Sequence, residues 1–404
     1  MNRMIHSSAA AGIYPLDASV PAAEKTAAAS RGRAEMTVEW VPLAALYVAE
    51  FERWRDLARR ALEPNVFFEP AFARAAATHL KGREIGAVAV HAGARLLGLM
   101  PGRIEGIASG RPVATFIAWA HPFAPFSTPL IDREAAADVV AAMLDFLPEL
   151  PGSPRLALFP LIDETGPAAR LIAGHLSRGG RAPHRLDPHA RAALMTGAGD
   201  ALDAVSAKKL KELRRQRRRL AEEGALTHES ITETNGIGAA VADYLAVESR
   251  GWKGRSGSAA LLHPAIGRFL AEAVAGLAAE GKARVDCLKL DGKTIAAAIT
   301  LFSGDRAWFW KTAYDEAFAR YSPGVQLALD LTETLGSNRT IAMVDSCAIA
   351  DHPMIDHLWS GRLAVADWLV PLAGEHTFVA GVAAERLRRA LISPLRMLRD
   401  RLGA

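Results

Sequence analysis

The sequence predicts an α/β (α+β) protein made of two related domains in tandem, each a mixed sheet flanked by helices. The chain has 404 residues, half of them apolar, which is enough to bury the cores of two domains. One order of strands and helices recurs in both halves, at a period far longer than that of a solenoid. We place the domains at 36–200 and 201–370, after a lead-in at 1–35 and before a helical tail at 371–404.

The composition indicates a globular protein of a reducing compartment. Residues 1–35 are rich in Ala, Ser and Gly without a sustained period, which predicts a disordered lead-in. No uncharged apolar run of about 18 residues and no secretory signal is present, so we expect a cytoplasmic protein without a membrane span. Cys287 and Cys347 are too few for a disulfide framework.

The first half alternates helical and strand patterns. Its loop before the third helix contains Ser127-Thr128-Pro129 and lacks a glycine at the helix start, so we expect no phosphate site in this copy. The predicted elements are helices 43–62 and 70–80, strands 85–91, 95–103 and 113–119, helix 134–147, strand 155–160 and helix 168–177.

A strongly basic helix is predicted between the halves, at 207–224. Leu210, Leu213 and Leu220 share one side of it, and Lys and Arg residues cover the rest. It is either a solvated helix docked by a thin leucine stripe or a surface for a polyanion. The run holds no aromatic residue and no nucleic-acid-binding motif accompanies it, so sequence-specific nucleic-acid binding is not expected.

The second half begins with a predicted helix at 237–250 and a glycine-rich loop at 251–258, before a helix at 263–280. Trp252, Lys253 and Arg255 lie in the loop, for which we predict contact with the substrate; a plain connecting loop is the alternative. The glycines do not have the Walker spacing, so nucleotide hydrolysis is not predicted.

A three-strand meander and a helix follow. Asp291-Gly292 and Gly304-Asp305 separate strands 284–290, 294–302 and 306–314 and suit tight hairpin turns. Helix 325–335 then starts after Pro323-Gly324, a combination that leaves backbone N–H groups open to an anion such as a phosphate.

Four motifs of this half resemble the GNAT acyltransferase superfamily, and more narrowly its CelD-like branch, associated with cellulose and exopolysaccharide production and related in fold to FemAB-type transferases. They are ESRGWKG (248–254), WKTAYD (310–315), YSPGVQ (321–326) and DSCA (345–348). The resemblance covers most of the chain after residue 40 and implies tandem GNAT-like domains. The usual superfamily loop has more glycines, whereas Gly324 stands alone here.

The resemblance implies a donor site for acyl-CoA, acetyl-CoA in particular, at the loop before helix 325–335. The residues expected to hold the pyrophosphate are Ser322, Pro323, Gly324, Val325 and Gln326. Lys311, Tyr314 and Asp315, at the end of the third strand, are predicted to line the acceptor cleft together with loop 251–258. FemAB relatives use aminoacyl-tRNA instead, which keeps a second donor open.

Acyl transfer to an amine also needs a group that removes a proton. Asp345, after the predicted strand 340–344, and His352 are our candidates. Pro353 suits the first position of a helix, and His352 or Asp351 would then be its cap, which is the structural alternative. Cys347, His352 and His357 lack the spacing of a metal site, so no metal is predicted. Cys347 is expected to be a small buried residue rather than a nucleophile.

The remainder, 358–404, has a mainly helical pattern, with a basic amphipathic end that suits either an anionic membrane or the protein's own surface. Together these features predict an N-acyltransferase with an amine acceptor, such as a sugar or glycan precursor. The alternatives are a FemAB-like transferase that uses aminoacyl-tRNA and a non-catalytic scaffold of a polysaccharide synthase. The oligomeric state is not predicted.

Overall fold

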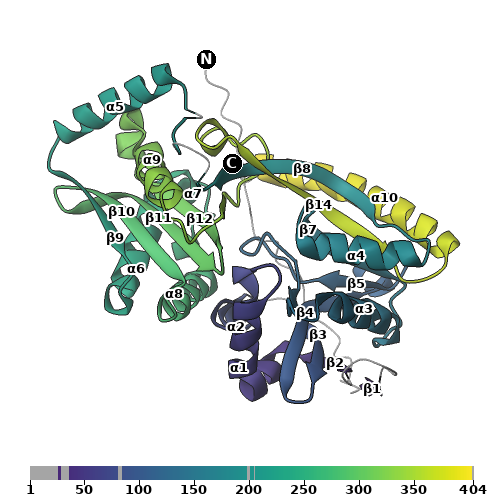
Figure 1. The fold of residues 1–404 in the computed structure, drawn as a ribbon. Coiled ribbons are helices and arrows are strands. Elements are labelled where there is room, and N and C mark those ends of the chain that lie inside the picture. The colour runs from purple at the N-terminus through teal and green to yellow at the C-terminus, as the bar shows by residue number, and fades with distance from the viewer. Residues whose placement is uncertain (1–25, 29–35, 81–83, 198–200, 204, 403–404) are drawn as a thin grey trace. The chain divides into compact units, whose positions relative to one another are not determined.

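The computed structural model describes residues 26–28, 36–80, 84–197, 201–203 and 205–402, with side chains from residue 36 to residue 391 (Figure 1). Apart from strand β1 (Thr26–Ala28), the predicted lead-in lies outside the described residues. The chain divides into two compact units. Unit 1 comprises Met1–Pro70, Lys81–His189 and Ala364–Ala404, and unit 2 comprises Ala71–Leu80 and Ala190–Leu363.

Unit 1 is a mixed sheet with helices on both faces. Its strands run in the order β1-β2-β3-β4-β5-β7-β14; β5 and β7 are parallel, the other neighbours are antiparallel, and β6 pairs with β4. The elements are β2 (Met36–Pro42), α1 (Leu43–Arg60), β3 (Gly86–Ala92), β4 (Arg95–Glu105), β5 (Thr115–Ala118), β6 (Leu130–Ile131), α3 (Ala136–Phe146), β7 (Leu156–Asp163), α4 (Pro167–Arg178), β14 (Gly361–Pro371) and α10 (Glu375–Leu402).

The core of unit 1 follows from the alternation of side chains along a strand. In β7, Ala157 and Phe159 face the cluster that holds the apolar sides of α3 and α4. Leu156 and Leu158 face the opposite way, in a cluster against which Phe378 and Val382 of α10 pack. This burial on both faces explains why β7 reads as a continuous apolar run.

Unit 2 repeats the same sheet plan. Its strands run β8-β13-β12-β11-β10-β9; β12 and β13 are parallel and the other neighbours antiparallel. The elements are α2 (Pro70–His79), β8 (His184–Met195), α5 (Ala207–Ala221), β9 (Leu226–Ile231), α6 (Thr234–Arg250), α7 (Trp252–Arg255), α8 (Pro264–Ala278), β10 (Ala283–Leu290), β11 (Lys293–Ser303), β12 (Arg306–Tyr314), α9 (Pro323–Gly336) and β13 (Met343–Asp345).

Helix α9 covers one face of the β10–β12 meander, and α6 and α8 cover the other (Figure 1). Leu327, Leu331 and Leu335 of α9 are buried in one cluster, as their spacing predicts. On the other face, the Trp310 ring lies 5.5 Å from Phe72 of α2 and 6.1 Å from Phe269 of α8. The predicted turn between β10 and β11 is present, because Asp291 and Gly292 both have positive φ, 48° and 76°.

Each unit contains a strand whose chain neighbours belong to the other unit. The bounds of the units therefore differ from the predicted 36–200 and 201–370. The second half of β8 follows α4 of unit 1 in the chain but pairs with β13 of unit 2. The main part of β14 follows the unit 2 sequence but pairs with β7 of unit 1. The prediction that 358–404 is mainly helical is therefore wrong for β14, and the tail is part of unit 1.

Within the described residues, no single helix has both the length and the apolar character needed to cross a membrane. One pair, Trp252–Leu262 with Pro264–Ala278, passes a test of length and composition when taken together, and it is bent by 70°.

Candidate functional site

The two parallel strands of unit 2 separate before β12 ends. Their pairing runs from Arg306 and Met343 to Trp308 and Asp345, whereas β12 continues to Tyr314. In the described part of the chain no strand pairs with this edge of β12 after Trp308. An extended ligand segment can therefore reach the backbone N–H and C=O groups of the strand here.

A bulge in β12 lies within this stretch. Lys311 is opposite Ile299 and Phe309 is opposite Thr300, so Trp310 is the extra residue of β12. Such a residue is left outside the regular ladder and re-aims its neighbours. The bulge therefore falls in the part of β12 that no described strand covers on this side.

Helix α9 begins beside the end of β12. Ser322 has a φ of 53°, and its carbonyl oxygen accepts the N–H groups of Val325 at 2.9 Å and Gln326 at 3.0 Å. A Cβ added to Gly324 would lie 3.2 Å from Cδ1 of Tyr314, so the glycine allows α9 to approach the Tyr314 ring. Among the five predicted donor-site residues, Ser322 and Val325 stay partly exposed, and Pro323, Gly324 and Gln326 are buried.

Gln326 has a structural bond of its own. Its buried side-chain Nε2 donates to the backbone oxygen of Leu213 at 2.8 Å, which ties α9 to α5. That bond gives Gln326 a fixed orientation that a sequence motif does not reveal.

The predicted substrate loop closes over the end of β12. Its start is the one-turn helix α7 rather than an irregular loop. The backbone N–H of Trp252 donates to Glu316 at 2.9 Å, and the Arg255 guanidinium pairs with the same carboxylate at 2.5 Å. Arg250 pairs with Asp315 at 2.9 Å. These bonds place loop 251–258 beside Glu316, the residue after the predicted Asp315.

Asp315 serves the local fold directly. Its side chain accepts the N–H of Ala317 at 3.1 Å and so caps the 3₁₀ helix Glu316–Tyr321. The side chain is nearly buried and also faces Arg250. Asp315 therefore anchors the end of α6 just before loop 251–258, and the neighbouring Tyr314 lies beside Gly324.

Glu248, near the end of α6, is a buried carboxylate that sequence reasoning missed. Its oxygens accept from Lys253 Nζ at 2.6 Å, from the Tyr244 hydroxyl at 3.0 Å and from the backbone N–H of Ala260 at 2.9 Å. Burial raises the pKa of Glu248, but the charge and hydrogen bond of Lys253 outweigh it, and the net pKa is lowered. Glu248 is part of the motif at 248–254, but the sequence does not indicate which residues bond to its carboxylate.

Lys311 lies close to this group. Burial and the nearby Lys253 charge lower the pKa of Lys311 to about 8, although Glu248 acts in the opposite direction. The Lys311 Nζ is 5.5 Å from the centre of the Trp310 ring. The structure therefore places the predicted cleft residues Lys253 and Lys311 near each other.

Asp345, our first candidate for proton transfer, lies in a buried ion pair. Arg191 of β8 donates to one oxygen, and the N–H of Cys347 donates to the other at 2.9 Å. Both charged side chains are 2% exposed. A carboxylate held in this way organises the turn after β13, where Cys347 has a φ of 52°. Burial, together with the Asp345 charge, raises the pKa of the Cys347 thiol well above its usual value.

His352 is bonded to its own turn. Its Nδ1 accepts the N–H groups of Met354 at 3.3 Å and Ile355 at 3.5 Å, which is the capping role considered as the structural alternative. The predicted helix at Pro353 is reduced to a 3₁₀ turn, Ile355–His357. Burial lowers the pKa of His352. In the described chain no hydrogen bond or ion pair joins His352 to Asp345.

A comparison with known protein families gives one match. Residues 207–352 match the family described as acetyltransferase (GNAT) domain. This segment of unit 2 is therefore similar to a GNAT domain. The match covers α5 through β13 and the turn after it, which includes the free edge of β12 and the start of α9. No curated protein sequence matches the chain.

Solved structures extend the likeness to both units. The C-terminal domain of a candidate lysylphosphatidylglycerol synthetase from Agrobacterium fabrum is 17% identical, with a TM-score of 0.51. The match covers 86% of this chain and 97% of that chain. A conserved protein of unknown function from Bacteroides thetaiotaomicron is 8% identical, with a TM-score of 0.53, over 81% and 97%. FemX is 12% identical, with a TM-score of 0.49, over 79% and 95%. The chain therefore has the predicted α/β fold in tandem, shared over most of its length with the first two of these structures.

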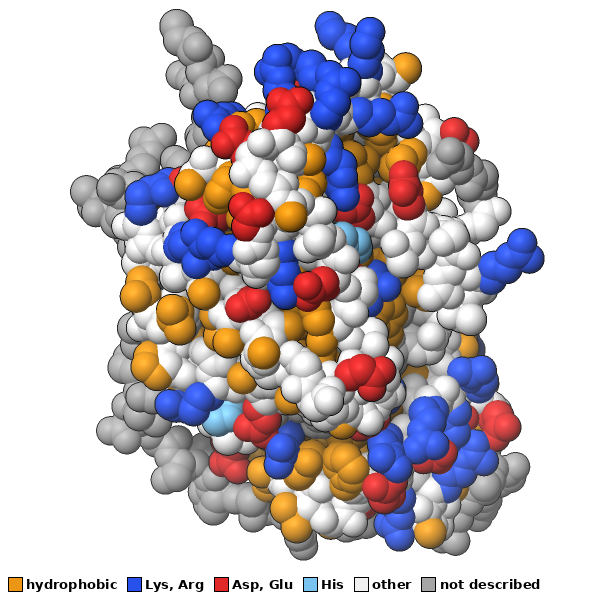
Figure 2. All heavy atoms as spheres, turned by 90° about the vertical axis from the view of Figure 1, so that its left-hand side faces the viewer, with side chains coloured by type: hydrophobic (Ala, Val, Ile, Leu, Met, Phe, Trp, Pro, Cys, Tyr) orange, Lys and Arg blue, Asp and Glu red, His pale blue; other side chains and the backbone are white. Residues whose placement is uncertain are grey.

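The basic helix of the GNAT domain is α5. Figure 2 shows Lys and Arg side chains gathered at the top of the face on which α5 lies. Two of the arginines have acidic partners: Arg215 bonds to Glu212 at 2.6 Å, and Arg217 bonds to Asp330 at 3.0 Å. The basic residues that are exposed are Lys208, Lys209, Lys211, Arg214, Arg215, Arg218 and Arg219.

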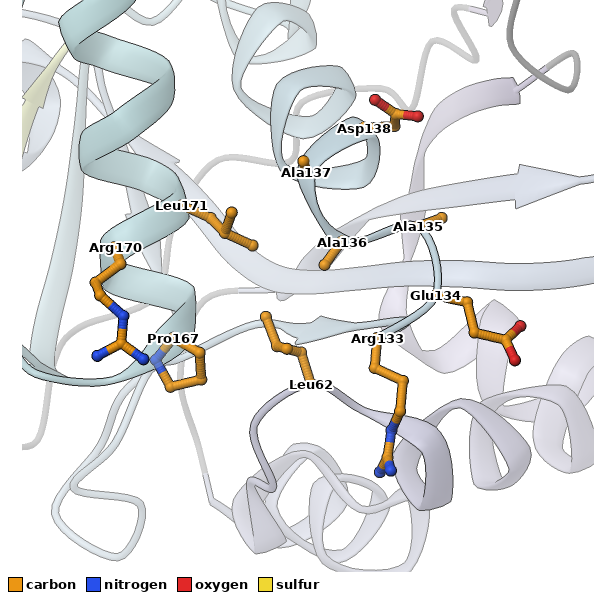
Figure 3. Close-up of a pocket in the computed structure, with 10 residues that line it drawn as sticks. All are labelled: Leu62, Arg133, Glu134, Ala135, Ala136, Ala137, Asp138, Pro167, Arg170 and Leu171. Carbon is orange, nitrogen blue, oxygen red and sulfur yellow. The ribbon is translucent and has the colours of Figure 1, made fainter.

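Two features of unit 1 lie outside the GNAT domain match. A pocket of about 490 Å³ opens at the starts of α3 and α4, with Leu62 and Leu171 in its wall and the arginines Arg133 and Arg170 beside it (Figure 3). It contains none of the predicted site residues. Glu39, Glu50 and His91 are the described residues close enough to share a metal ion. The two His91 nitrogens face different carboxylates, with Nε2 2.9 Å from Glu50 and Nδ1 3.7 Å from Glu39.

Proposed function

We propose that this protein is an N-acyltransferase that moves an acyl group, acetyl in the first instance, from acyl-CoA to an amine. The observation that carries the proposal is the free edge of β12 after Trp308, which opens beside the start of α9 within the GNAT domain. Backbone N–H groups of this edge can bond to the extended arm of acyl-CoA. They can also bond to the oxyanion that forms at the thioester carbonyl. The start of α9 offers the positive end of a helix to its phosphates.

Unit 1 provides an internal contrast. Its parallel pair, β5 and β7, ends at Ile117 and Leu158, and β5 itself ends one residue later at Ala118. Unit 1 therefore presents no long free edge on β5. We infer that the donor binds in unit 2 only, as the loop sequences also suggest.

The acceptor amine would enter from the side of α7. Trp252, Lys253 and Arg255 surround the end of β12 together with Lys311 and Tyr314. Lys253 and Arg255 are paired to acidic residues, so they can shape the cleft without leaving buried, unpaired charges. An anionic or hydroxyl-rich acceptor such as an amino sugar suits this lining.

The test is the binding of coenzyme A, measured by calorimetry. We expect Gly324→Val to abolish binding, because the added methyl groups crowd the start of α9. The Tyr314 contact at 3.2 Å also predicts a loss of about 1–3 kcal/mol in stability for this variant. Gly238→Val in α6 is the matched control, since a Cβ there meets nothing within 4 Å. Equal affinity of the folded Gly324 variant and the wild type would remove the donor site.

The FemAB-like alternative is favoured by one observation, the exposed basic side of α5. A helix that grips tRNA neutralises many phosphates, so binding would fall with salt with a log–log slope of several units. We expect instead that changing Arg214, Arg215, Arg217 and Arg218 together to Gln weakens coenzyme A binding less than about tenfold. Micromolar tRNA binding that this variant loses, without coenzyme A binding by the wild type, would support the alternative. Binding of neither donor would favour a scaffold.

Several finer assignments stay proposals. They are the CelD-like branch, a role in polysaccharide or cell-envelope biosynthesis, a cytoplasmic location and contact of the C-terminal helix with a membrane. In the described part of α10, Arg388 and Arg389 pair with Glu385 at 2.7 and 2.8 Å. Arg389 also pairs with Asp367 of β14 at 2.7 Å, so this stretch docks on unit 1 itself.

A further inference from the structure

We propose that Lys311 is the group that accepts the proton of the acceptor amine, and that the Glu248–Lys253 pair keeps it ready to do so. The inference rests on the proposed function and names the base that the sequence assigned to Asp345 or His352.

Lys311 lies in the part of β12 beyond Trp308, which no described strand covers on this side. It follows the bulged residue Trp310, three positions after the last residue that pairs with β13. Trp310 packs toward α2 and α8, and the Lys311 Nζ stays within 5.5 Å of its ring centre. The Lys311 side chain is half-buried. A thioester lying along the edge would therefore have the amine of Lys311 beside its reacting carbon.

The charged groups around Lys311 come from three elements. Lys253 of α7 opposes a second positive charge, and Glu248 of α6 favours one. Glu248 is already committed to Lys253, Tyr244 and the Ala260 N–H, so it compensates Lys311 only in part. Cys347, after β13, is a further neighbour, and burial raises the pKa of its thiol. With a pKa near 8, about a tenth of Lys311 is neutral at pH 7.

The other candidates are poorly suited to the same task. Asp345 is buried in an ion pair with Arg191, and Nδ1 of His352 accepts N–H groups of its own turn. Both groups are therefore engaged in the local structure around them.

The step balances without a further reactant. The nitrogen of the neutral amine attacks the thioester carbonyl, a C–N bond forms, and the C–S bond breaks with its electron pair on the coenzyme A sulfur. The amine proton passes to Nζ of Lys311, giving an ammonium. That ammonium then protonates the departing thiolate, which yields the amide, the free thiol and neutral Lys311.

The test needs no knowledge of the natural acceptor. Without one, a neutral Lys311 beside acetyl-CoA should itself become acetylated, and peptide mass spectrometry locates the product. We expect acetylation at Lys311 to exceed that at Lys289 by about tenfold or more, with a rate that rises through a midpoint near pH 8. Trace labelling by acetic anhydride at each pH measures the same midpoint independently of coenzyme A.

Two variants sharpen the result. Lys253→Met removes the neighbouring cation and frees Glu248 to pair with Lys311, so the labelling midpoint should move up. Lys289→Met, which breaks an exposed pair with Glu229 on β9, should leave it unchanged. If coenzyme A binds but Lys311 is acetylated no faster than Lys289, or its midpoint lies near 10.5, the proposal is overturned and the proposed function stands. If coenzyme A does not bind, the proposed function is lost and the role of Lys311 with it.

Discussion

Replacing Glu248 by Ala should destabilise unit 2 through the groups that the carboxylate leaves behind. The substitution removes the acceptor of the Lys253 ammonium, the buried Tyr244 hydroxyl and the Ala260 N–H. Tyr244 is fully buried, and the whole Glu248 residue is 6% exposed. An unpaired donor in such surroundings loses its hydrogen bond and gains no water in exchange.

The size of the effect follows from the exposure of each partner. Breaking a buried ion pair costs about 3–5 kcal/mol when the remaining charge stays buried. The Lys253 side chain is 28% exposed and can rehydrate, which favours the lower end of that range, about 3 kcal/mol. For a domain of 150–250 residues this corresponds to a fall in Tm of about 6–12 °C.

Thermal unfolding monitored by circular dichroism measures the change. Glu229→Ala is the matched control, because the Glu229–Lys289 pair has the same 2.6 Å length but a carboxylate that is 49% exposed. The control should cost less than about 1 kcal/mol. Since the pKa of Glu248 is lowered in the fold, its stabilising effect is present above its ordinary pKa of 4.5 and is lost as the pH falls below that value. Equal Tm losses in the two variants would refute the reasoning.

Two other predictions concern buried ion pairs. Arg191→Met should cost about 3–5 kcal/mol, because it leaves Asp345 buried without its cation; urea unfolding measures it, and a loss smaller than 1 kcal/mol would contradict the buried pair. Burial raises the pKa of Glu385, but hydrogen bonds and charges of Arg388, Arg111 and Arg389 lower it overall to about 2, so docking of α10 should weaken only as the pH falls from 4.5 toward 2. Proteolysis of the α10 segment should accelerate in that interval for the wild type, and already at neutral pH for Glu385→Gln.

The sequence predicted most of the fold wherever local rules decide it. The β10–β12 meander follows from Asp291-Gly292 and from strands with branched and aromatic residues, and the leucine spacing of α9 gives its buried side. It did not predict β14, because an apolar run buried on both faces cannot be told from a buried helix by periodicity. It also missed β8, whose polar residues and Pro188 do not resemble a strand.

The candidate site was predicted in part for the same reason. Lys311, Tyr314 and Gly324 lie in one short stretch of chain. Residues of one sequence motif are therefore also close together in space here. The partner of Asp345 is Arg191, 154 positions away, and no local pattern reveals that pairing. Glu248 was visible in a motif, but its three donors depend on how α6, α7 and the following turn fold together. Tertiary contacts thus decided which carboxylates are structural.

The exchange of β8 and β14 has a consequence for synthesis on the ribosome. When unit 1 has emerged as far as α4, β7 still lacks the neighbour that it gains only with residues 365–371. During translation of the whole GNAT domain, β7 therefore has one open edge, of the kind that invites pairing with other chains. A fragment that stops after unit 2 would keep that edge for good, so expression of separate halves should yield aggregates, and chaperone demand should end only when the last strand is made.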